Sequence, residues 1–358
     1  MFKTKHYVPI LRWKQAERLA LRYLYESDKT RITPFIELIP KPFRPPKRGK
    51  WKDVAPDCGS VLRHTAKEML RHWGYAPAFV DFQHLEGIVG PINGRIHPFG
   101  YFAELARSYK LHIVPVTGLN RSITYQAAVC SISSADGNGI CVRLKHSDVR
   151  HEDCLQRIRD LLGNAGTTPE QVDLILDYES YENEAPEIGA VLRELPFLHS
   201  WRSLTVARGA FPKDLQGFNP GMHVIPRSDW LAWKQDVLNP RLSRKPAFAD
   251  YTIQYGRYEE PPDNANPSAS IRYTLDEQWL VLRGEGIFNE DGPGRAQWNA
   301  HARLLVDRDE FYGERFSYGD AYVNEMSNKP GEHGSPMTWI RAGLNHHITV
   351  VSQQIAAL

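Results

Sequence analysis

Short apolar segments with the character of β-strands alternate with helical segments along most of this 358-residue chain. Most of these strand segments are apolar on both alternating faces, as strands are when a sheet is buried on both sides. A regular order of strand and then helix implies parallel strands joined by right-handed crossovers. The predicted strands are eight: 7–12, 32–40, 78–85, 111–120, 139–146, 172–180, 203–211 and 248–256. The pattern therefore predicts an α/β protein with a TIM-barrel-like (β/α)8 fold.

An open, doubly wound sheet is the alternative arrangement of the same alternating elements. Its dinucleotide-binding form is disfavoured, because no G-x-G-x-x-G motif follows the first predicted strand. The chain is long for a small domain, but its length is normal for one barrel that carries insertions. Its content of 42% hydrophobic residues is sufficient for a large core.

The pattern changes after the eighth predicted strand. The segment IRYTLDEQWLVLRG predicts a hairpin that turns at 275–277, and the helix predicted at 296–307 is assigned as the eighth helix of the barrel. The loop before the hairpin and the tail after the helix are polar, and we expect them to form a cap over the barrel mouth. The whole prediction is one barrel domain over 1–358, with a basic, proline-rich insert at 41–57 and hairpin and cap segments at 258–295 and 308–345.

Composition and charge restrict the classes of function. The net charge of only +2 argues against broad nucleic-acid binding, which stays the less favoured possibility. No apolar run approaches the roughly 20 residues of a membrane span, so no membrane partner is expected. The four cysteines have no C-x-x-C spacing and the first residues carry no signal-peptide pattern, which together predict a cytoplasmic protein. No metal site is predicted and the sequence identifies no cofactor.

Charged residues recur at matching places in the predicted strands. Aligned on their apolar beginnings, four strands place Glu37, Asp81, Arg143 and Asp177 at the same level. Gln83, Lys145 and Glu179 follow two residues later, and a spacing of two puts both members of a pair on one face of a strand. In a barrel, one face of each strand looks into the interior, and its C-terminal end lies at the mouth where active sites form. We therefore expect these charges to converge.

The convergence predicts two groups of site residues. The candidate acid–base residues are Glu37, Asp81, Asp177, Glu179 and His346, and the candidate ligand-binding residues are Gln83, Arg143, Lys145, Arg208, Arg283 and His347. The basic residues of the second group are compatible with a ligand that carries phosphate. The alternative interpretation is a closed network of salt bridges, because isolated buried charges are costly and such networks neutralise them.

His346 and His347 are adjacent, so their side chains diverge by about 100° on a helix or 180° on a strand. Only one of them can therefore face the barrel mouth, as an acid–base group or a phosphate donor. The other is expected to pack or to cap. A structural role for either histidine remains the alternative.

Several blocks resemble a known family. The opening HYVPILRWKQAERLAL…ITPFIELIP and the later blocks IRYTLDEQWLVLRG, FSYGDAYV and WIRAGLNHHIT are similar to those of the beta-family proteins, named after a beta protein of a T-even bacteriophage. The resemblance covers most of the chain. It implies a bacterial or phage cytosolic protein with a role in phage–host conflict, and it implies no particular activity, cofactor or catalytic set.

Two hypotheses of function follow. In the first, the protein binds or acts on a small anionic ligand, phosphate- or nucleotide-like, at the barrel mouth. In the second, it is a non-catalytic component that binds a protein partner in a phage-defence or phage-encoded complex, and the barrel charges only stabilise the fold. Whether the protein is an enzyme stays open at this point.

Overall fold

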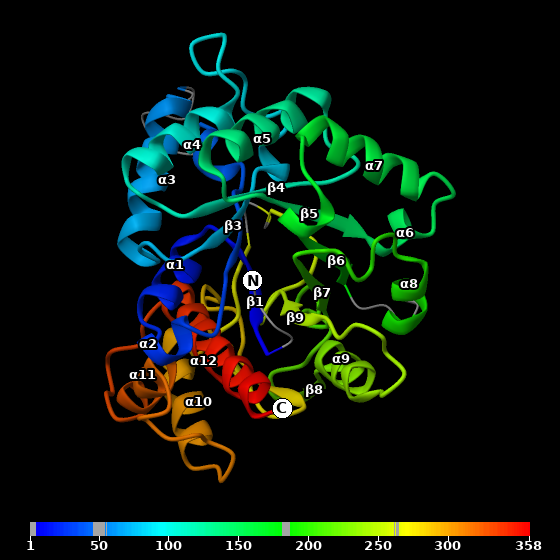
Figure 1. The fold of residues 1–358 in the computed structure, drawn as a ribbon. Helices are drawn as coiled ribbons and strands as arrows, with labels where there is room; N and C mark the ends of the chain where they lie inside the picture. The colour runs from blue at the N-terminus through cyan, green and yellow to red at the C-terminus, as the bar shows by residue number, and fades with distance from the viewer. Residues whose placement is uncertain (1–4, 46–53, 55, 181–186, 261, 263–264) are drawn as a thin grey trace.

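The computed structural model describes residues 5–45, 54, 56–180, 187–260, 262 and 265–358, and its centre is a closed barrel of eight parallel strands (Figure 1). The order around the barrel is β1-β2-β3-β4-β5-β6-β7-β9, and β9 closes it by pairing with β1. These strands are β1 (Tyr7–Arg12), β2 (Phe35–Glu37), β3 (Ala78–Asp81), β4 (Ile113–Thr117), β5 (Ile140–Lys145), β6 (Val172–Ser180), β7 (Ser203–Gly209) and β9 (Ala247–Asp250). The predicted (β/α)8 fold is confirmed, and each of the eight predicted segments overlaps one barrel strand.

Helices surround the barrel, and each strand's alternating side chains divide between its interior and the helices. Val8 and Ile10 of β1 lie in the interior cluster, whereas Tyr7 and Leu11 lie in the outer cluster between strands and helices. The α-helices and 3-10 helices before β7 are α1 (Gln15–Arg22), α2 (Glu26–Lys29), η1 (Lys41–Phe43), α3 (Cys58–His72), η2 (Gln83–Leu85), α4 (Pro98–Ser108), α5 (Ile123–Asp136), α6 (His146–Val149), α7 (Cys154–Ala165), η3 (Pro169–Gln171) and α8 (Ile188–Glu194). None of the helices in the described ranges combines the length and the apolar composition needed to cross a bilayer.

A second, smaller sheet lies beside the barrel. It is antiparallel, with the order β10-β11-β8, and consists of β8 (Gly221–Pro226), β10 (Ile271–Thr274) and β11 (Gln278–Arg283). The hairpin β10–β11 was predicted, but β8 was not, because it lies between β7 and α9 (Ser228–Leu238), where the alternating pattern predicts only a connection. One face of the sheet packs on α10 (Gln297–Val306) and α11 (Tyr318–Ser327), which lie outside the barrel (Figure 1). The short helix η4 (Gly294–Ala296) directly precedes α10.

The eighth helix of the barrel is α12 (Pro336–Ala357), and the assignment of 296–307 to that role is wrong. α12 packs against α1, and its residues Ile348, Val351 and Ile355 join the outer core cluster of the barrel. α10 instead packs against α11 and β10. Helical periodicity shows that a helix covers a sheet, but it does not show which of two sheets it covers.

The segments expected to cap the barrel have two different positions. The tail 308–345 contains α11, which packs on α10 and α12, and none of its described residues lines the pocket at the barrel mouth. The loop after β9 does reach the mouth, through Gly256, Arg257 and Tyr258. Most of the basic insert, residues 46–53 and 55, lies outside the described residues.

A buried polar junction joins α12 to the barrel and to the small sheet. His347 Nε2 lies 2.9 Å from Asp250 Oδ2 at the end of β9, and its Nδ1 lies 2.8 Å from Thr274 Oγ1 of β10. His346 Nδ1 lies 2.8 Å from Asp320 Oδ2 of α11, and its Nε2 donates to the carbonyl oxygen of Thr274 at 2.8 Å. Both histidines therefore connect three parts of the fold, outside the barrel wall.

Replacement of His347 by leucine is expected to lower the free energy of unfolding by about 3 kcal/mol, because Asp250 would keep a buried carboxylate without its main partner. Urea unfolding at neutral pH measures this change. His223→Leu on β8 is the matched control, since His223 is only partly buried, and its effect is expected to stay within about 0.5 kcal/mol. Equal effects of the two replacements would contradict a junction role for His347.

Candidate functional site

The barrel register brings charged side chains together at the C-terminal ends of the strands. Arg12, Glu37 and Asp81 are direct neighbours across β1, β2 and β3. All three face the interior, because they follow the inward residues Ile10, Phe35 and Phe79 by two positions. Asp177 follows the inward Ile175 in the same way. The alternation of the strands thus fixes which side chains meet at the mouth.

Arg143 of β5 lies at the centre of this group and contacts three carboxylates. Its Nη1 donates to Glu37 Oε1 at 2.8 Å and to Asp81 Oδ2 at 3.1 Å, and its Nε donates to Asp177 Oδ2 at 2.7 Å. Nη2 donates to the Tyr251 hydroxyl at 2.8 Å, and that hydroxyl donates to Asp177 at 2.7 Å. The three carboxylates are buried, so the guanidinium is the charge that holds them together.

Asp81 has further partners besides Arg143. Arg121 Nη2 lies 3.2 Å from Asp81 Oδ2, and the Tyr125 hydroxyl donates to Asp81 Oδ1 at 3.2 Å. The same Arg121 nitrogen donates to the side-chain oxygen of Gln83 at 2.8 Å. These contacts orient Gln83, which lines the pocket.

Glu179 is placed by an irregular strand end. The pairing of β6 with β7 shifts between Asp177 and Ser180, and Glu179 has the left-handed φ of 56°, which is uncommon for a residue other than glycine. The backbone N–H of Glu179 donates to Asp177 Oδ1 at 2.8 Å. Gly256 lies against this turn so closely that a Cβ there would be 2.4 Å from the Glu179 carbonyl oxygen. The loop after β9 can therefore approach β6 only with glycine at 256.

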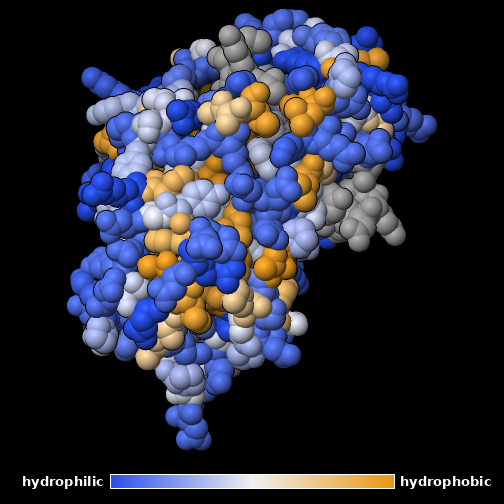
Figure 2. All heavy atoms as spheres, turned by 90° about the horizontal axis from the view of Figure 1, so that it is seen from below, coloured by the Kyte–Doolittle hydropathy of each residue, from blue (hydrophilic) through white to orange (hydrophobic). Residues whose placement is uncertain are grey.

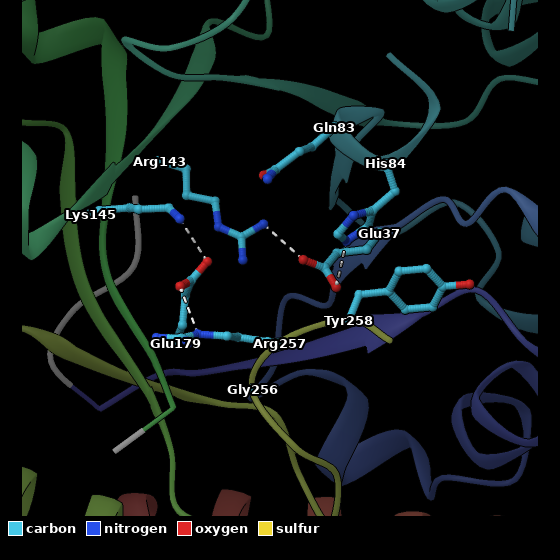
Figure 3. Close-up of a pocket in the computed structure, with 9 residues that line it drawn as sticks. All are labelled: Glu37, Gln83, His84, Arg143, Lys145, Glu179, Gly256, Arg257 and Tyr258. Atoms are coloured by element: carbon cyan, nitrogen blue, oxygen red, sulfur yellow. Dashed lines mark hydrogen bonds and ion pairs between the residues drawn. The ribbon is translucent and has the colours of Figure 1, made fainter. Parts of the chain in front are cut away.

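A pocket of about 430 Å³ opens at this mouth (Figure 3). Its lining consists of Glu37, Gln83, His84, Arg143, Lys145, Glu179, Gly256, Arg257 and Tyr258. On one side Glu179 lies between two cations, 2.9 Å from Lys145 Nζ and 3.3 Å from Arg257 Nε. On the other side Glu37 lies beside His84, whose ring packs on Tyr258 at 4.8 Å between centroids. Arg143 lies between the two sides (Figure 3).

The surroundings shift the protonation of the acidic and basic groups. Burial raises the pKa of Glu37, but Arg143, His84 and Arg12 outweigh burial and bring that pKa below its usual value. Burial likewise raises the pKa of Glu179, and Lys145 reverses the effect, so that its pKa is also lowered. Burial by itself would lower the pKa of Arg143, but Tyr251 and Asp177 raise it well above its ordinary value. The two carboxyl groups are therefore anionic, and Arg143 is cationic, at neutral pH.

Of the residues predicted for the site, the structure brings seven together at the mouth: Glu37, Asp81, Gln83, Arg143, Lys145, Asp177 and Glu179. Four others lie elsewhere. Arg208 alternates with the inward Ala207 and so faces outward, where its guanidinium lies 4.0 Å from the centre of the Tyr178 ring. Arg283 belongs to the small sheet and donates to the carbonyl oxygen of Leu215, and His346 and His347 lie in the buried junction.

Sequence reasoning did not assign several residues of the mouth: Arg12, His84, Arg121, Tyr251, Arg257 and Tyr258. The alignment that found Glu37 and Asp81 also contained the signal for Arg12, which ends the first strand at the same level. Tyr251 likewise follows the inward Ala249 by two residues. The other four come from loops and from η2, whose positions the strand pattern does not determine. Within the described ranges, no group of three or more His, Cys, Asp or Glu is arranged to hold a metal ion.

The fold and the mouth together define the class of protein, a closed (β/α)8 barrel with a charged pocket at the C-terminal ends of its strands. The chain belongs to the Beta protein family, whose model matches residues 7–353. The resemblance drawn from the sequence is thus confirmed over nearly the whole chain. No curated protein matches it.

Several solved structures are distantly similar. The YdjI aldolase from Escherichia coli K12 is 7% identical, with a TM-score of 0.37, over 98% of this chain and 88% of the other. A triazine hydrolase variant is 13% identical, with a TM-score of 0.29, over 57% of this chain and 44% of the other. SacUVDE is 11% identical, with a TM-score of 0.32, over 70% of this chain and 93% of the other. At these values none of the three bears on the activity of this chain.

Replacement of Arg143 by methionine is expected to lower the free energy of unfolding by about 3 to 5 kcal/mol at pH 7, because it leaves buried carboxylates without their shared cation. The loss should shrink between pH 7 and pH 4. In the natural protein the lowered pKa of Glu37 stabilises the fold fully above the usual value of 4.5, and this stabilisation fades as the pH falls toward the folded pKa. In the variant the effect of burial on Glu37 dominates. Protonation of this carboxyl group at low pH then removes the cost of an unpaired buried charge.

Urea unfolding at both pH values measures these changes. Arg107→Met is the control, since the Arg107 side chain is 44% exposed and pairs with a single carboxylate, Asp136, and its effect is expected to stay below about 1 kcal/mol. A loss in Arg143→Met that grows on acidification would contradict the central role of this arginine.

Proposed function

We propose that this protein binds a small anionic ligand, a phosphate or phosphate ester such as a nucleotide, at the barrel mouth. The observation that carries the proposal is the pair of cations Lys145 and Arg257, which flank the pocket with a single carboxylate, Glu179, between them. Their side chains are 48% and 51% exposed, so a ligand can reach both. An incoming phosphate would accept charge-assisted hydrogen bonds from the two.

The charges of the whole mouth support an anion in preference to a cation. Its carboxylates are Glu37, Asp81, Asp177 and Glu179, and its cations are Arg12, Arg121, Arg143, Lys145 and Arg257. The buried arginines are matched by the buried carboxylates, so the surplus positive charge lies at the exposed rim. The pocket volume of about 430 Å³ is within the range of small-molecule sites.

We also propose the compartment and the biological role in which this binding occurs. Membership of the Beta protein family supports a protein of a bacterial or phage cytosol with a role in phage–host conflict. All four cysteines are free thiols, which is consistent with a reducing compartment.

Titration of the protein with inorganic phosphate at low ionic strength tests the proposal. Lys145→Ala and Arg257→Ala are each expected to raise the dissociation constant about tenfold, because each removes a charge-assisted hydrogen bond worth about 1.5 kcal/mol. Lys234→Ala is the matched control, since Lys234 also pairs with a glutamate, Glu277, but lies on α9 away from the mouth. Isothermal calorimetry gives the constants. Phosphate affinity that falls equally in Lys234→Ala, or that is absent from the natural protein, would refute a site at the mouth.

Protein binding is the second candidate function, and β8 is the observation that favours it. β8 is an edge strand of the small sheet, and Met222 and Val224 on it are 49% and 55% exposed. Figure 2 shows the molecule from below, the side on which β8 lies in Figure 1, and apolar side chains gather on that face. An extended segment of a partner protein could pair with such an edge and cover its apolar residues.

Val224→Lys is expected to abolish an association of this kind, because a charged side chain on the exposed strand opposes pairing. Native mass spectrometry of the protein isolated from its host compares the natural chain with this variant, and phosphate binding should not change. A partner that stays bound to Val224→Lys but dissociates from Lys145→Ala would place the interface at the barrel mouth and exclude β8.

A further inference from the structure

Three neighbouring polar atoms lack hydrogen bonds: two belong to Glu37 and His84, which line the pocket, and the third belongs to Arg12 behind them. Glu37 Oε2 lies 3.5 Å from His84 Nε2 and 3.6 Å from Arg12 Nε, within ion-pair range but with hydrogen-bond geometry to neither. Glu37 is 2% exposed and Arg12 is 6% exposed. Buried polar atoms are nearly always hydrogen-bonded in folded proteins, so three neighbouring exceptions beside one pocket need an explanation.

Their neighbours hold these atoms in place. Glu37 is fixed through its other oxygen, which accepts from Arg143 at 2.8 Å. Arg12 is fixed through Nη2, which donates to the carbonyl oxygens of Tyr255 and Gly256 at 2.7 and 3.1 Å. The His84 ring packs on Tyr258. The Glu37 oxygen is thus held within 3.6 Å of both nitrogens, and the three atoms define one position beside the pocket.

A hydroxyl group matches this position. The carboxylate oxygen of Glu37 can only accept a hydrogen bond, and the Nε of Arg12 can only donate one. His84 Nε2 can do either, according to its tautomer. A ligand hydroxyl has one proton to give to Glu37 and lone pairs to receive an N–H, so one such group satisfies both kinds of partner. A phosphate oxygen would meet the Glu37 carboxylate with like charge and is excluded from this side.

The pocket therefore has two chemically different ends. Lys145 and Arg257 form the cationic end, and Glu37 with His84 and Arg12 forms the end that recognises a hydroxyl (Figure 3). Arg143 lies between them and contacts the Glu37 carboxylate. A molecule that reaches both ends must carry an anionic group and a separate hydroxyl group.

We propose that the ligand is a hydroxylated organic anion, that is, a phosphate ester of a polyol or a sugar. This inference rests on the proposed anion binding and adds the class of molecule. The cationic end supplies the affinity for phosphate, and the unpartnered atoms at Glu37 select the hydroxyl. Sites that hydrogen-bond a hydroxyl reject analogues without it, because their own polar groups are then left unpaired.

Two probes of the same carbon skeleton test the selection. Glycerol 3-phosphate carries two hydroxyl groups, and n-propyl phosphate carries none. The natural protein is expected to bind glycerol 3-phosphate about tenfold more tightly or better, since the unpaired groups penalise the propyl compound. Calorimetric titration of each probe, with inorganic phosphate for reference, gives the ratio.

Variants test the contributions of the two ends of the pocket separately. His84→Phe keeps a ring beside Tyr258 and removes the nitrogen, so the preference for glycerol 3-phosphate should fall toward unity while phosphate binding persists. His223→Phe is the control, because His223 packs on Phe218 at 5.1 Å in the small sheet, and the preference should stay unchanged. Glu37→Gln should act like His84→Phe, but Glu37 also pairs with Arg143, so its replacement weakens the fold and His84→Phe is the decisive variant.

The outcomes distinguish a failure of hydroxyl selection from a failure of anion binding. If both probes bind with equal affinity, the hydroxyl selection is refuted and anion binding stands, with water as the partner of the three atoms. If neither probe nor phosphate binds, anion binding itself is refuted. A preference that survives in His84→Phe and also in Glu37→Gln would refute the assignment of the selecting atoms.

Discussion

The contact of one guanidinium with three carboxylates is the interaction on which the barrel mouth depends. Arg143 contacts Glu37, Asp81 and Asp177, which come from three separate strands. Without a shared cation these carboxylates could not be buried together, because the transfer of isolated charges from water is too costly. The network and the pocket are not alternatives here. The network neutralises the deep charges, and its outermost members form the wall of the pocket.

Much of the fold follows from the sequence, because a strand's alternation is a local property. Side chains alternate between the two faces of a strand, and this alternation places Glu37, Asp81 and Asp177 on the inward face. It also places Arg208 on the outward face, since Arg208 is adjacent to the inward Ala207. A cation at the end of a strand belongs to the site only when its position in the alternation is inward, and Arg208 does not meet this condition. Arg12 does meet it, since it pairs with Glu37 at the same level.

The remaining differences arise where position depends on contacts distant in sequence. Tyr258 and Arg257 reach the mouth only because Gly256 approaches the turn at Glu179, a fit that neither segment shows alone. His346 and His347 are correctly read as adjacent groups with divergent directions. Their partners, Asp320 and Asp250, come from α11 and from the end of β9, so the pair joins the helices beside the small sheet to the barrel and lies away from the pocket.

The place of α12 has a consequence for the way the chain reaches its native state. The strand β9 is followed by β10, β11, α10 and α11, and only then by α12, the helix that completes the barrel wall beside α1. During synthesis on the ribosome, the apolar outer face of β1 therefore stays uncovered until this last helix emerges. Incomplete barrels with such surfaces are prone to aggregate. The outer wall of the barrel is thus completed late, although β1 is the first of its strands to be made.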